Sequence, residues 1–343
     1  MGVAAQVTLL VTGGAGFIGS AFVRMALNEG WANHVVVFDK LTYAGNLENL
    51  EPVAAHRGYR FIQADICDGA AVDQAIKDEV PDAIVHFAAE SHVDRSIHSP
   101  VPVIQTNFNG TFVLLEAARR LSVPRFLHIS TDEVYGSIDE PYHADETYPL
   151  RASSPYSASK AASDLLALSY FTTYKLNVIV TRASNNYGPY QFPEKLIPLT
   201  ISNALDGKPL PVYGDGLQVR DWLYVEDHCR AVFAALDRGR AGEIYNVGGN
   251  CSLPNIEVVR RILRATGRPE SLITRVADRP GHDRRYALTS DKLSRETGWE
   301  PQMQFDEGLA ATIRWYQKRE DWVVRVKSGE YQRFYEQNYA RRG

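Results

Sequence analysis

The feature that most constrains the fold is a glycine-rich loop between a short apolar run and a helical pattern. The apolar run covers residues 7–11, and the helical pattern begins at Phe17. Gly13, Gly16 and Gly19 stand at the spacing G-x-x-G-x-x-G. Glycine permits the tight turn and lets a pyrophosphate approach the backbone at a helix N-terminus. The loop therefore predicts a strand–turn–helix unit that binds a dinucleotide.

The strand–helix rhythm continues through the first half of the chain. Runs rich in Val, Ile and Phe suit strands that are covered on both faces. Their alternation with helical patterns predicts right-handed crossovers, and hence an α/β fold with a doubly wound parallel sheet. The expected strands cover residues 7–12, 34–38, 59–62, 83–87, 125–130 and 178–181, and the expected helices cover 17–29, 71–79, 103–121 and 155–174.

The rhythm changes after Asn185. Prolines and glycines punctuate the following stretch, and amphipathic helical patterns come next, at residues 226–236, 256–265 and 306–319. We expect residues 1–185 to form a Rossmann domain that carries the catalytic residues. We expect residues 186–343 to form mainly a smaller, mixed α/β lobe that binds the substrate. This division leaves room for segments of the second half to return to the Rossmann domain.

Composition excludes several classes of protein. The chain has 343 residues, of which 45% are hydrophobic and 23% charged, and a net charge of −4. These values suit a soluble globular protein and give no basic footprint for nucleic acid. The three cysteines, Cys67, Cys229 and Cys251, form no metal-binding pattern, so we expect free thiols, no metal and a cytoplasmic location. The N-terminal apolar run is too short for a signal peptide or a membrane span, so we expect no membrane partner.

One carboxylate narrows the choice of dinucleotide. Asp39 ends the second expected strand, 20 residues after Gly19 (39 − 19 = 20). A carboxylate there binds the ribose hydroxyls and repels a 2′-phosphate, which favours NAD over NADP, although Lys40 weakens this preference slightly. Asp65 and Ile66 end the third strand and could hold the adenine. The competing interpretation is a structural turn with a solvated Asp39.

Tyr156 and Lys160 form a candidate base. They stand four positions apart (160 − 156 = 4), which places the phenol and the ammonium on one face of a helix. A nearby ammonium favours phenolate, so we expect Tyr156 to act as a base below its reference pKa of about 10. A phenolate beside a nicotinamide can take the hydroxyl proton of an alcohol while hydride leaves its carbon.

A second acid/base pair follows the fifth strand. The strand that ends at Ser130 delivers Thr131, Asp132 and Glu133 to the carboxyl edge of the sheet, where doubly wound folds bind ligands. Two adjacent carboxyls support chemistry that simple alcohol oxidation does not need. The alternative is structural, because Ser130 and Glu133 match the capping box S-x-x-E. Such a helix would meet Gly136 after a single turn.

Together these motifs resemble the extended short-chain dehydrogenase/reductase family, and within it the nucleotide-sugar 4,6-dehydratases. The resemblance extends over nearly the whole chain. Asp132 and Glu133 are its most specific part, because this pair separates the dehydratases from the sugar epimerases of the same fold. The matching segments are residues 39–46, 88–94, 130–136, 185–198, 214–227 and 278–286.

The resemblance implies a hydro-lyase of deoxysugar biosynthesis with firmly held NAD. Its substrate would be a nucleoside-diphosphate glucose, with dTDP-glucose as the first expectation. C4 oxidation, elimination across C5 and C6, and hydride return to C6 would give the 4-keto-6-deoxy sugar and water. Tyr156, Lys160 and Thr131 would serve at C4, Glu133 at the C5 hydrogen, and a protonated Asp132 at the C6 hydroxyl. A homodimer is also implied, through helices at residues 103–121 and 155–174.

The resemblance also implies which residues contact each ligand. For NAD these are the glycine loop with Phe17, Ile18, Asp39, Lys40, Thr42, Asp65, Ile66, Ala88, Thr106, Tyr156, Lys160 and Asn186. For the nucleotide sugar they are Ser91, Thr131, Asn185, Lys195, Leu196, Pro211, Tyr213, Arg220, Asn255, Arg279 and His282.

Two other functions stay open at this point. One is a nucleotide-sugar 4-epimerase, which would oxidise and re-reduce C4 without losing water. The other is an NAD-binding sensor or scaffold without turnover. The nucleotide also stays open between thymidine and uridine, because one methyl group contributes only about 1–3 kcal/mol in a pocket.

Overall fold

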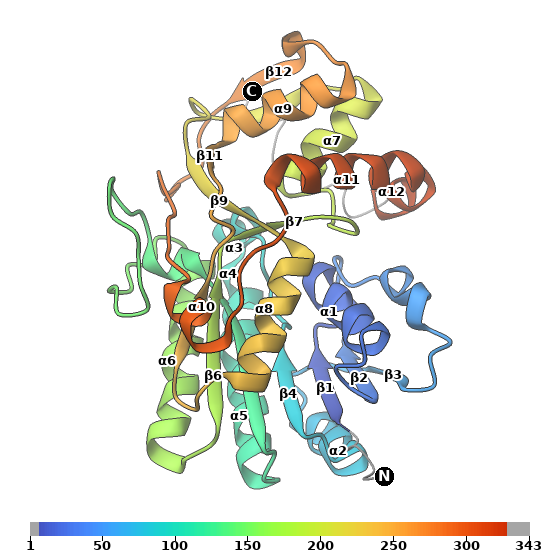
Figure 1. Ribbon diagram of the computed structural model, residues 1–343, viewed down its shortest axis with the longest axis vertical. Coiled ribbons are helices and arrows are strands. Elements are labelled where there is room, and N and C mark those ends of the chain that lie inside the picture. Colours follow the sequence, from blue (N-terminus) through green and yellow to red (C-terminus); the bar gives the residue numbers. More distant parts are fainter. Residues whose placement is uncertain (1–6, 328–343) are drawn as a thin grey trace.

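A parallel seven-stranded sheet is the framework of the molecule (Figure 1). The computed structural model describes residues 7–327. All neighbouring strands in this sheet are parallel, which confirms the doubly wound fold class expected from the sequence. In spatial order the strands are β10 (Ile244–Val247), β6 (Val178–Ala183), β5 (Arg125–Thr131), β4 (Ala83–His86), β1 (Thr8–Thr12), β2 (His34–Asp39) and β3 (Tyr59–Gln63).

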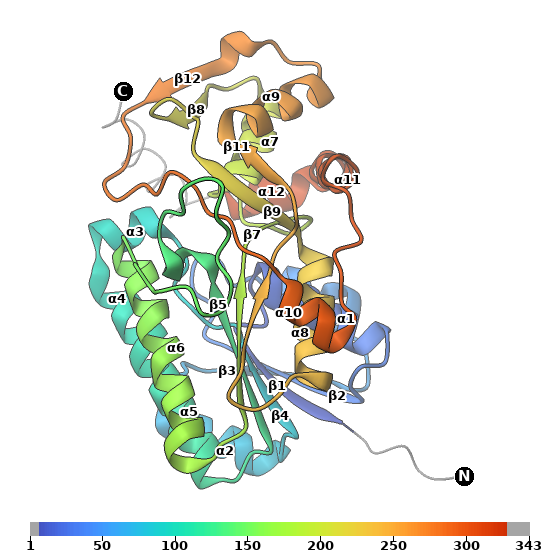
Figure 2. The same ribbon diagram turned by 60° about the vertical axis from the view of Figure 1, so that its left-hand side comes forward.

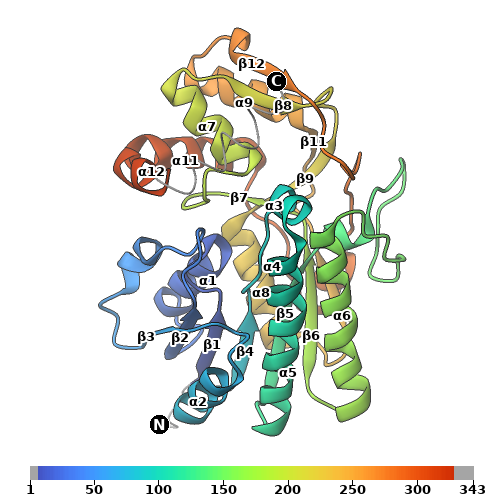
Figure 3. The same cartoon turned by 180° about the vertical axis from the view of Figure 1, so that it is seen from behind.

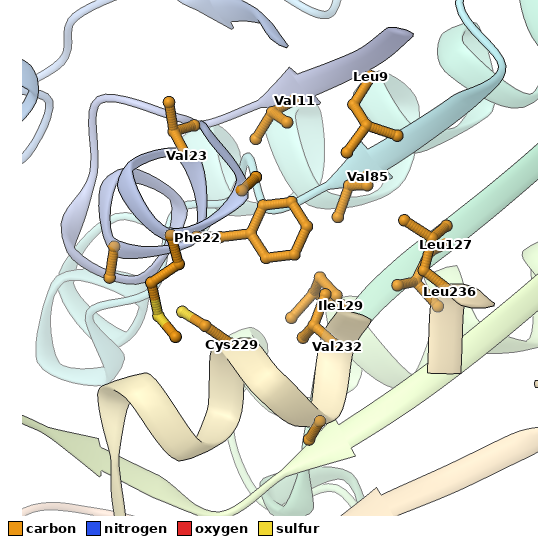
Figure 4. Close-up of a cluster of buried hydrophobic side chains, with 14 of the residues drawn as sticks. Leu9, Val11, Phe22, Val23, Val85, Leu127, Ile129, Cys229, Val232 and Leu236 are labelled. Atoms are coloured by element: carbon orange, nitrogen blue, oxygen red, sulfur yellow. The ribbon is translucent and has the colours of Figure 1, made fainter. Parts of the chain in front are cut away.

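Helices cover both faces of this sheet, which explains why its strands are apolar throughout (Figures 1 and 3). On one face lie α1 (Phe17–Asn28) and α8 (Val225–Arg238). On the other lie α2 (Gly69–Glu79), α5 (Thr111–Arg120) and α6 (Pro155–Tyr174). In the first layer the Phe22 ring packs between the strands and Val232 of α8 (Figure 4).

The helical stretch expected over residues 103–121 is confirmed, but it is not one regular α-helix. It consists of α4 (Pro100–Ile104), a π-helical turn (Gln105–Gly110) and α5. The Asn107 side chain in the π turn bonds to two other segments of the chain. Its amide donates to the Glu90 carbonyl at 3.0 Å and to the Ser159 hydroxyl at 2.9 Å. Such bulges re-aim side chains, and this one turns Thr106 toward the carboxyl edge of the sheet.

The remaining elements lie beyond the carboxyl edge of the large sheet (Figure 2). A second core of aromatic and aliphatic side chains holds them together. One small sheet contains β7 (Asn185–Tyr187), β9 (Val219–Tyr224) and β11 (Ser252–Pro254), and another contains β8 (Leu210–Tyr213) and β12 (Ile273–Val276). The helices are α7 (Leu196–Asp206), α9 (Asn255–Thr266), α11 (Phe305–Lys318) and α12 (Glu320–Val326).

The chain returns to the large sheet after Asn185. Helix α8 packs against α1, and β10 pairs with β6 at the sheet edge. Two short helices complete the fold, α3 (Val93–His98) after β4 and α10 (Asp291–Thr297) against α8. The three helices expected after residue 220 match α8, α9 and α11 to within two residues at each end. Within residues 7–327 no helix has the length and apolarity that a membrane crossing would need.

Candidate active site

One cavity of about 410 Å³ lies between the carboxyl edge of the large sheet and the smaller C-terminal elements. Its walls come from the loops after β1, β2, β4, β5 and β6, from α6, and from the segment around β8 and β9. Every candidate site residue expected from the sequence lines this cavity, with the exception of Asp65. The strand order reverses between β1 and β4, which is the crevice where doubly wound sheets bind ligands.

The glycine loop brings the start of α1 into this crevice. At Gly13, where φ is +70°, a Cβ atom would lie 2.5 Å from the Ala88 amide nitrogen. At Gly19 it would lie 2.3 Å from the Gly13 carbonyl oxygen. Helix α1 starts after Gly16 with no side-chain cap, so no side chain occupies the amides of its first turn. An uncapped helix N-terminus beside a glycine turn fits a pyrophosphate.

Asp39 is held beside this loop. Its Oδ2 accepts a hydrogen bond from the Ala15 amide at 3.0 Å, and its Oδ1 accepts one from the Leu41 amide at 2.8 Å. Burial raises the pKa of Asp39, and the two amides oppose that effect. The neighbouring Lys40 ammonium lies 3.3 Å from Asp65 Oδ2, so Asp65 faces Lys40 and not the cavity. The ion pair with Asp65 offsets the positive charge of Lys40, which would otherwise attract the 2′-phosphate of NADP.

A capping box fixes the start of α6. The Ser154 hydroxyl accepts from the Ser157 amide at 3.1 Å, and the Ser157 hydroxyl accepts from the Ser154 amide at 3.0 Å. With Pro155 in the first position, this cap sets where the helix begins. Tyr156 and Lys160 then lie on the cavity wall, 8% and 3% exposed.

The electrostatics of this pair contradict the expectation that Lys160 lowers the pKa of Tyr156. Burial, reinforced by the Glu133 carboxylate, raises the pKa of Tyr156, and a hydrogen bond from Thr131 only partly offsets the increase. Burial also lowers the pKa of Lys160 to about 8. The physical reason is geometric: the Lys160 ammonium donates to the Ile129 carbonyl at 2.7 Å, whereas the phenol faces the carboxyls after β5. Removal from water dominates both groups.

The turn after β5 differs from the capping box proposed above. The N-cap is Thr131, the last residue of β5, and not Ser130: the Thr131 hydroxyl accepts from the Glu133 amide at 3.2 Å. The turn is a single 3-10 turn, Asp132–Tyr135, and Gly136 ends it, as expected from the sequence. Gly136 ends the turn with φ at +69°, and a side chain is excluded there because a Cβ would lie 2.2 Å from the Arg151 carbonyl oxygen.

Asp132 and Glu133 lie in different environments although they are neighbours. Asp132 is 3% exposed, and burial, followed by the Glu133 and Asp221 charges, raises the pKa of Asp132 well above its ordinary value. Its Oδ2 has no hydrogen-bond partner among residues 7–327. Glu133 is only partly buried, and the Tyr286 hydroxyl donates to it at 3.5 Å. The pair thus offers a proton donor beside an accessible carboxylate, which is the asymmetry that acid/base chemistry needs.

Three cations line the far side of the cavity. The Lys195 ammonium donates to the Ser91 carbonyl at 2.6 Å. Arg220 is 5% exposed and stacks over the Tyr286 ring at 4.1 Å. In the described part of the chain, Arg279 Nε is buried without a hydrogen-bond partner. An arginine with an unused donor, flanked by two further cations, fits a diphosphate.

Sequence patterns missed several polar residues of this cavity. Among them is Glu194, which is buried and whose pKa burial raises to about 7. The Tyr43 hydroxyl donates to it at 3.0 Å, and Arg95 Nε lies 3.6 Å away. Tyr286 and His228, which lies 2.9 Å from the Asn186 amide oxygen, were also missed. The partners of Glu194 come from distant loops, so they could not be found from the sequence. The only signal in the sequence was the position of Glu194 next to Lys195.

Comparison with known proteins agrees with this geometry. The family model described as GDP-mannose 4,6 dehydratase matches residues 10–312. The dTDP-glucose 4,6-dehydratase of Shigella flexneri is 53% identical over 97% of this chain and 99% of that protein. The protein of the same name from Xanthomonas campestris pv. campestris strain B100 is 53% identical over 94% of this chain and 97% of its own.

Solved structures give the same picture. DesIV, a dTDP-glucose 4,6-dehydratase from Streptomyces venezuelae with NAD and TYD bound, matches with a TM-score of 0.92 and 51% identity, over 94% of this chain and 100% of its own. The UDP-glucose 4-epimerase of Thermus thermophilus, in complex with NAD, matches with a TM-score of 0.85 and 34% identity, over 91% of this chain and 100% of its own.

The glycine loop generates a testable prediction. We expect Gly13→Ala to lower the free energy of unfolding by about 3 kcal/mol, because left-handed strain of about 1–2 kcal/mol adds to the clash with Ala88. Gly267→Ala is the matched control, since φ is +65° there but no atom lies within 4 Å of the new Cβ. Denaturant unfolding of both variants measures the difference. Equal losses would mean that the close approach at Gly13 has no energetic weight.

Proposed function

The chain belongs to the family described as GDP-mannose 4,6 dehydratase, and from this premise we propose that it converts dTDP-glucose into its 4-keto-6-deoxy sugar and water with NAD. One observation carries the proposal. A buried Asp132, whose pKa burial raises well above its ordinary value, stands beside an accessible Glu133 in the cavity wall that also holds Tyr156. Oxidation at one carbon needs only Tyr156, whereas loss of water needs a separate acid and base.

NAD, when bound, accepts a hydride from C4 of the sugar and returns it to C6, so that no net oxidation occurs. The residues present fit such a dinucleotide. The uncapped start of α1 presents amides for the pyrophosphate, and the Asp39 carboxylate lies beside the loop for the ribose. We assign the remaining contacts to Phe17, Ile18, Lys40, Thr42, Ile66, Ala88, Thr106, Tyr156, Lys160 and Asn186. Asp65, which was also expected to contact NAD, acts through its ion pair with Lys40.

Tyr156 takes the C4 hydroxyl proton, and Thr131 hydrogen-bonds the C4 oxygen. Because burial and Glu133 oppose the phenolate, Tyr156 acts as a base only when further positive charge lies beside it. Lys160 contributes part of that charge and helps to hold the ribose. Its pKa of about 8 leaves it mostly protonated at neutral pH.

Glu133 then removes the C5 proton, which the new C4 ketone has made acidic, and C5 takes up a proton again when C6 receives the hydride. Asp132 donates its proton to the departing C6 hydroxyl as water leaves. Burial suits Asp132 to the donor role, because an acid that keeps its proton at neutral pH can deliver it. The partial exposure of Glu133 suits it to the complementary role of base.

The nucleotide part of the substrate lies at the opposite wall. Lys195, Arg220 and Arg279 bind the diphosphate, as their charges and the unused Arg279 donor suggest. Pro211 and Tyr213 offer a flat apolar slot for the pyrimidine. We assign the other contacts to Ser91, Thr131, Asn185, Leu196, Asn255 and His282. In this division residues 1–185 carry the cofactor and the chemistry, and residues 186–343 mainly bind the nucleotide sugar.

Product analysis distinguishes this function from its alternatives. Incubation with dTDP-glucose should give a product lighter by one water, and dTDP-glucose should be preferred to UDP-glucose. A product of unchanged mass with inverted C4 would indicate an epimerase, the activity named for the Thermus thermophilus relative. No product from either nucleotide sugar would indicate a sensor or scaffold.

A first prediction concerns the cofactor. We expect denatured protein to release NAD, because each turnover regenerates it. Asp39→Asn should lower the ratio of NAD to NADP affinity by about tenfold or more, since one repulsive charge pair contributes about 1–4 kcal/mol near a protein surface. Binding titrations with both dinucleotides measure this ratio. Release of NADP, or an unchanged ratio in the variant, would overturn the role given to Asp39.

A second prediction concerns the dehydration pair. Glu133→Gln should reduce turnover about 10²–10⁴-fold, together with exchange of the C5 hydrogen with heavy water, because the base is gone. Asp132→Asn should slow loss of the C6 hydroxyl and leave 4-keto sugar that still contains its water. Mass spectrometry of quenched reactions separates these products.

The control for this pair is Glu140→Gln, a carboxylate on a nearby loop whose side chain is 79% exposed. This variant should turn over at the wild-type rate. Wild-type rates of 4-keto-6-deoxy product in both Glu133→Gln and Asp132→Asn would reduce the pair to a turn cap and remove the mechanistic basis of the dehydratase.

We also propose a homodimer through a four-helix bundle. Helices α4, α5 and α6 lie side by side on one face of the molecule (Figures 2 and 3). Their outer surface carries exposed apolar side chains, a pattern typical of protein interfaces. These are Val101 at 74%, Ile104 at 44%, Phe112 at 46%, Leu165 at 60% and Tyr174 at 51% exposure.

The mass in solution tests this interface. We expect Leu165→Glu to shift the protein from dimer to monomer in light scattering, because the new charge would be buried between subunits. Val324→Glu is the control, since Val324 is 63% exposed on α12, away from these helices. A wild-type monomer would refute the homodimer, and a dimer in Leu165→Glu would place the interface elsewhere.

A cytoplasmic location is part of the same proposal. The three cysteines are free thiols in the structure, which suits a reducing compartment. Among residues 7–327 no group of three or more His, Cys, Asp or Glu side chains is arranged to hold a metal ion.

A further inference from the structure

A fully buried carboxylate lies beneath the catalytic helix, and the chemistry described above does not use it. Asp164 on α6 is 0% exposed. Its Oδ2 accepts from Arg182 Nε at 2.8 Å, and its Oδ1 lies 3.3 Å from His128 Nε2. Arg182 belongs to β6 and His128 to β5, so the Asp164 side chain joins the helix to two strands. Figure 3 shows α6 beside these strands.

Asp164 continues the face of α6 that carries the proposed base. Tyr156, Lys160 and Asp164 are spaced four residues apart, so their side chains follow one another along the helix. The Lys160 ammonium donates to the carbonyl of Ile129, the residue after His128. Lysine and carboxylate therefore both reach toward the same strand.

The charges around Lys160 leave Asp164 as its counter-charge. On the strands, His86 of β4 and His128 of β5 are buried, and burial lowers the pKa of both, that of His128 to about 4, so both are neutral. Arg182 of β6 is a second cation. On the turn after β5, Asp132 keeps its proton and Glu133 faces the Tyr156 phenol, which is itself neutral. Among the described residues, Asp164 is the carboxylate that opposes the loss of charge on Lys160.

The same cluster reaches the turn that carries the dehydration pair. Arg182 Nη1 donates to the Tyr135 hydroxyl at 3.0 Å, and that hydroxyl donates to the Asn246 amide oxygen at 2.7 Å. Tyr135 is the last residue of the turn that begins with Asp132. Through Arg182, Asp164 thus links the base on α6 with the acid after β5.

We propose that Asp164 is a positioning residue whose buried carboxylate keeps the Lys160 ammonium charged and fixes α6 against β5 and β6. The inference rests on the proposed function, which gives Lys160 its task beside the cofactor. Loss of the carboxylate would leave Lys160 and Arg182 as two buried cations without an anion. Lys160 would release its proton first, because an arginine side chain stays protonated under all ordinary conditions.

The test removes the charge and keeps the shape. In Asp164→Asn we expect Lys160 to titrate at least about one pH unit lower than in the wild type. NMR of ¹³C-labelled lysine in the holoenzyme without substrate measures this midpoint, with the signal assigned by its loss in Lys160→Met. A lysine is active while charged, so kcat/KM should fall about fivefold or more near pH 8, where half of the wild-type lysine is charged, and hardly at all near pH 6. An unchanged midpoint would overturn the proposal.

His128→Gln is the matched control. It removes the other partner of the carboxylate but leaves the charge of Asp164 and its ion pair with Arg182. We expect its Lys160 midpoint to stay within a few tenths of a pH unit of the wild-type value. If the cluster served only packing, both variants would lose activity equally at every pH, and neither midpoint would move.

A second variant keeps the test possible if Asp164→Asn does not fold. Asp164→Asn leaves Arg182 unpaired, which is strongly destabilising, whereas the double variant Asp164→Asn/Arg182→Gln removes both charges together. Because Asp164, and not Arg182, is the charge that acts on the Lys160 ammonium, the double variant must still lower the Lys160 midpoint, and an unchanged value would refute the proposal. The midpoint is measured without substrate, so failure to turn over dTDP-glucose would refute the proposed function and leave this test intact.

Discussion

The parallel direction of the strands in the large sheet is the constraint on which the rest of the structure depends. Because all of its strands point the same way, the loops after β1, β2, β4, β5 and β6 meet at one edge. The glycine turn, Asp39 and Thr131 are far apart in the sequence, yet each directly follows or ends a strand. Gly13 lies so close to the backbone of Ala88 that no side chain would fit between them.

Removal from water sets the chemistry of that edge. The same burial raises the pKa of Tyr156 and Asp132 and lowers that of Lys160. In each case burial shifts the equilibrium toward the neutral form of the side chain. For Asp132 this result serves the proposed reaction directly, because a proton donor must hold its proton. For Tyr156 it opposes the reaction, so the base depends on positive charge brought beside it. The Lys160–Asp164–Arg182 cluster is where the chain itself maintains that charge.

The buried polar network also explains why the fold tolerates so many ionisable groups in its interior. Arg182 and Asp164 neutralise each other, and neutral His128 packs beside them in the layer between α6 and the strands. A buried ion pair adds little stability compared with apolar packing, because desolvation offsets the attraction. What it adds here is orientation, since the guanidinium also holds Tyr135 and thereby the turn after β5.

The sequence by itself predicted the doubly wound sheet, the glycine turn and the limits of α6, whereas most of the candidate cavity residues followed from the family resemblance. The sheet, the turn and the helix limits depend on local periodicity, capping and spacing, which neighbouring residues encode. Only the tertiary structure decided four other features. These are the π-helical turn at Asn107, the pairing of β10 with β6, the ion pair of Lys40 with Asp65, and the hydrogen bond from Tyr43 to Glu194. It also showed that burial, and not Lys160, dominates the pKa of Tyr156. These outcomes depend on contacts between distant segments and on how much water reaches each group, and neither is encoded in the spacing of residues along the chain.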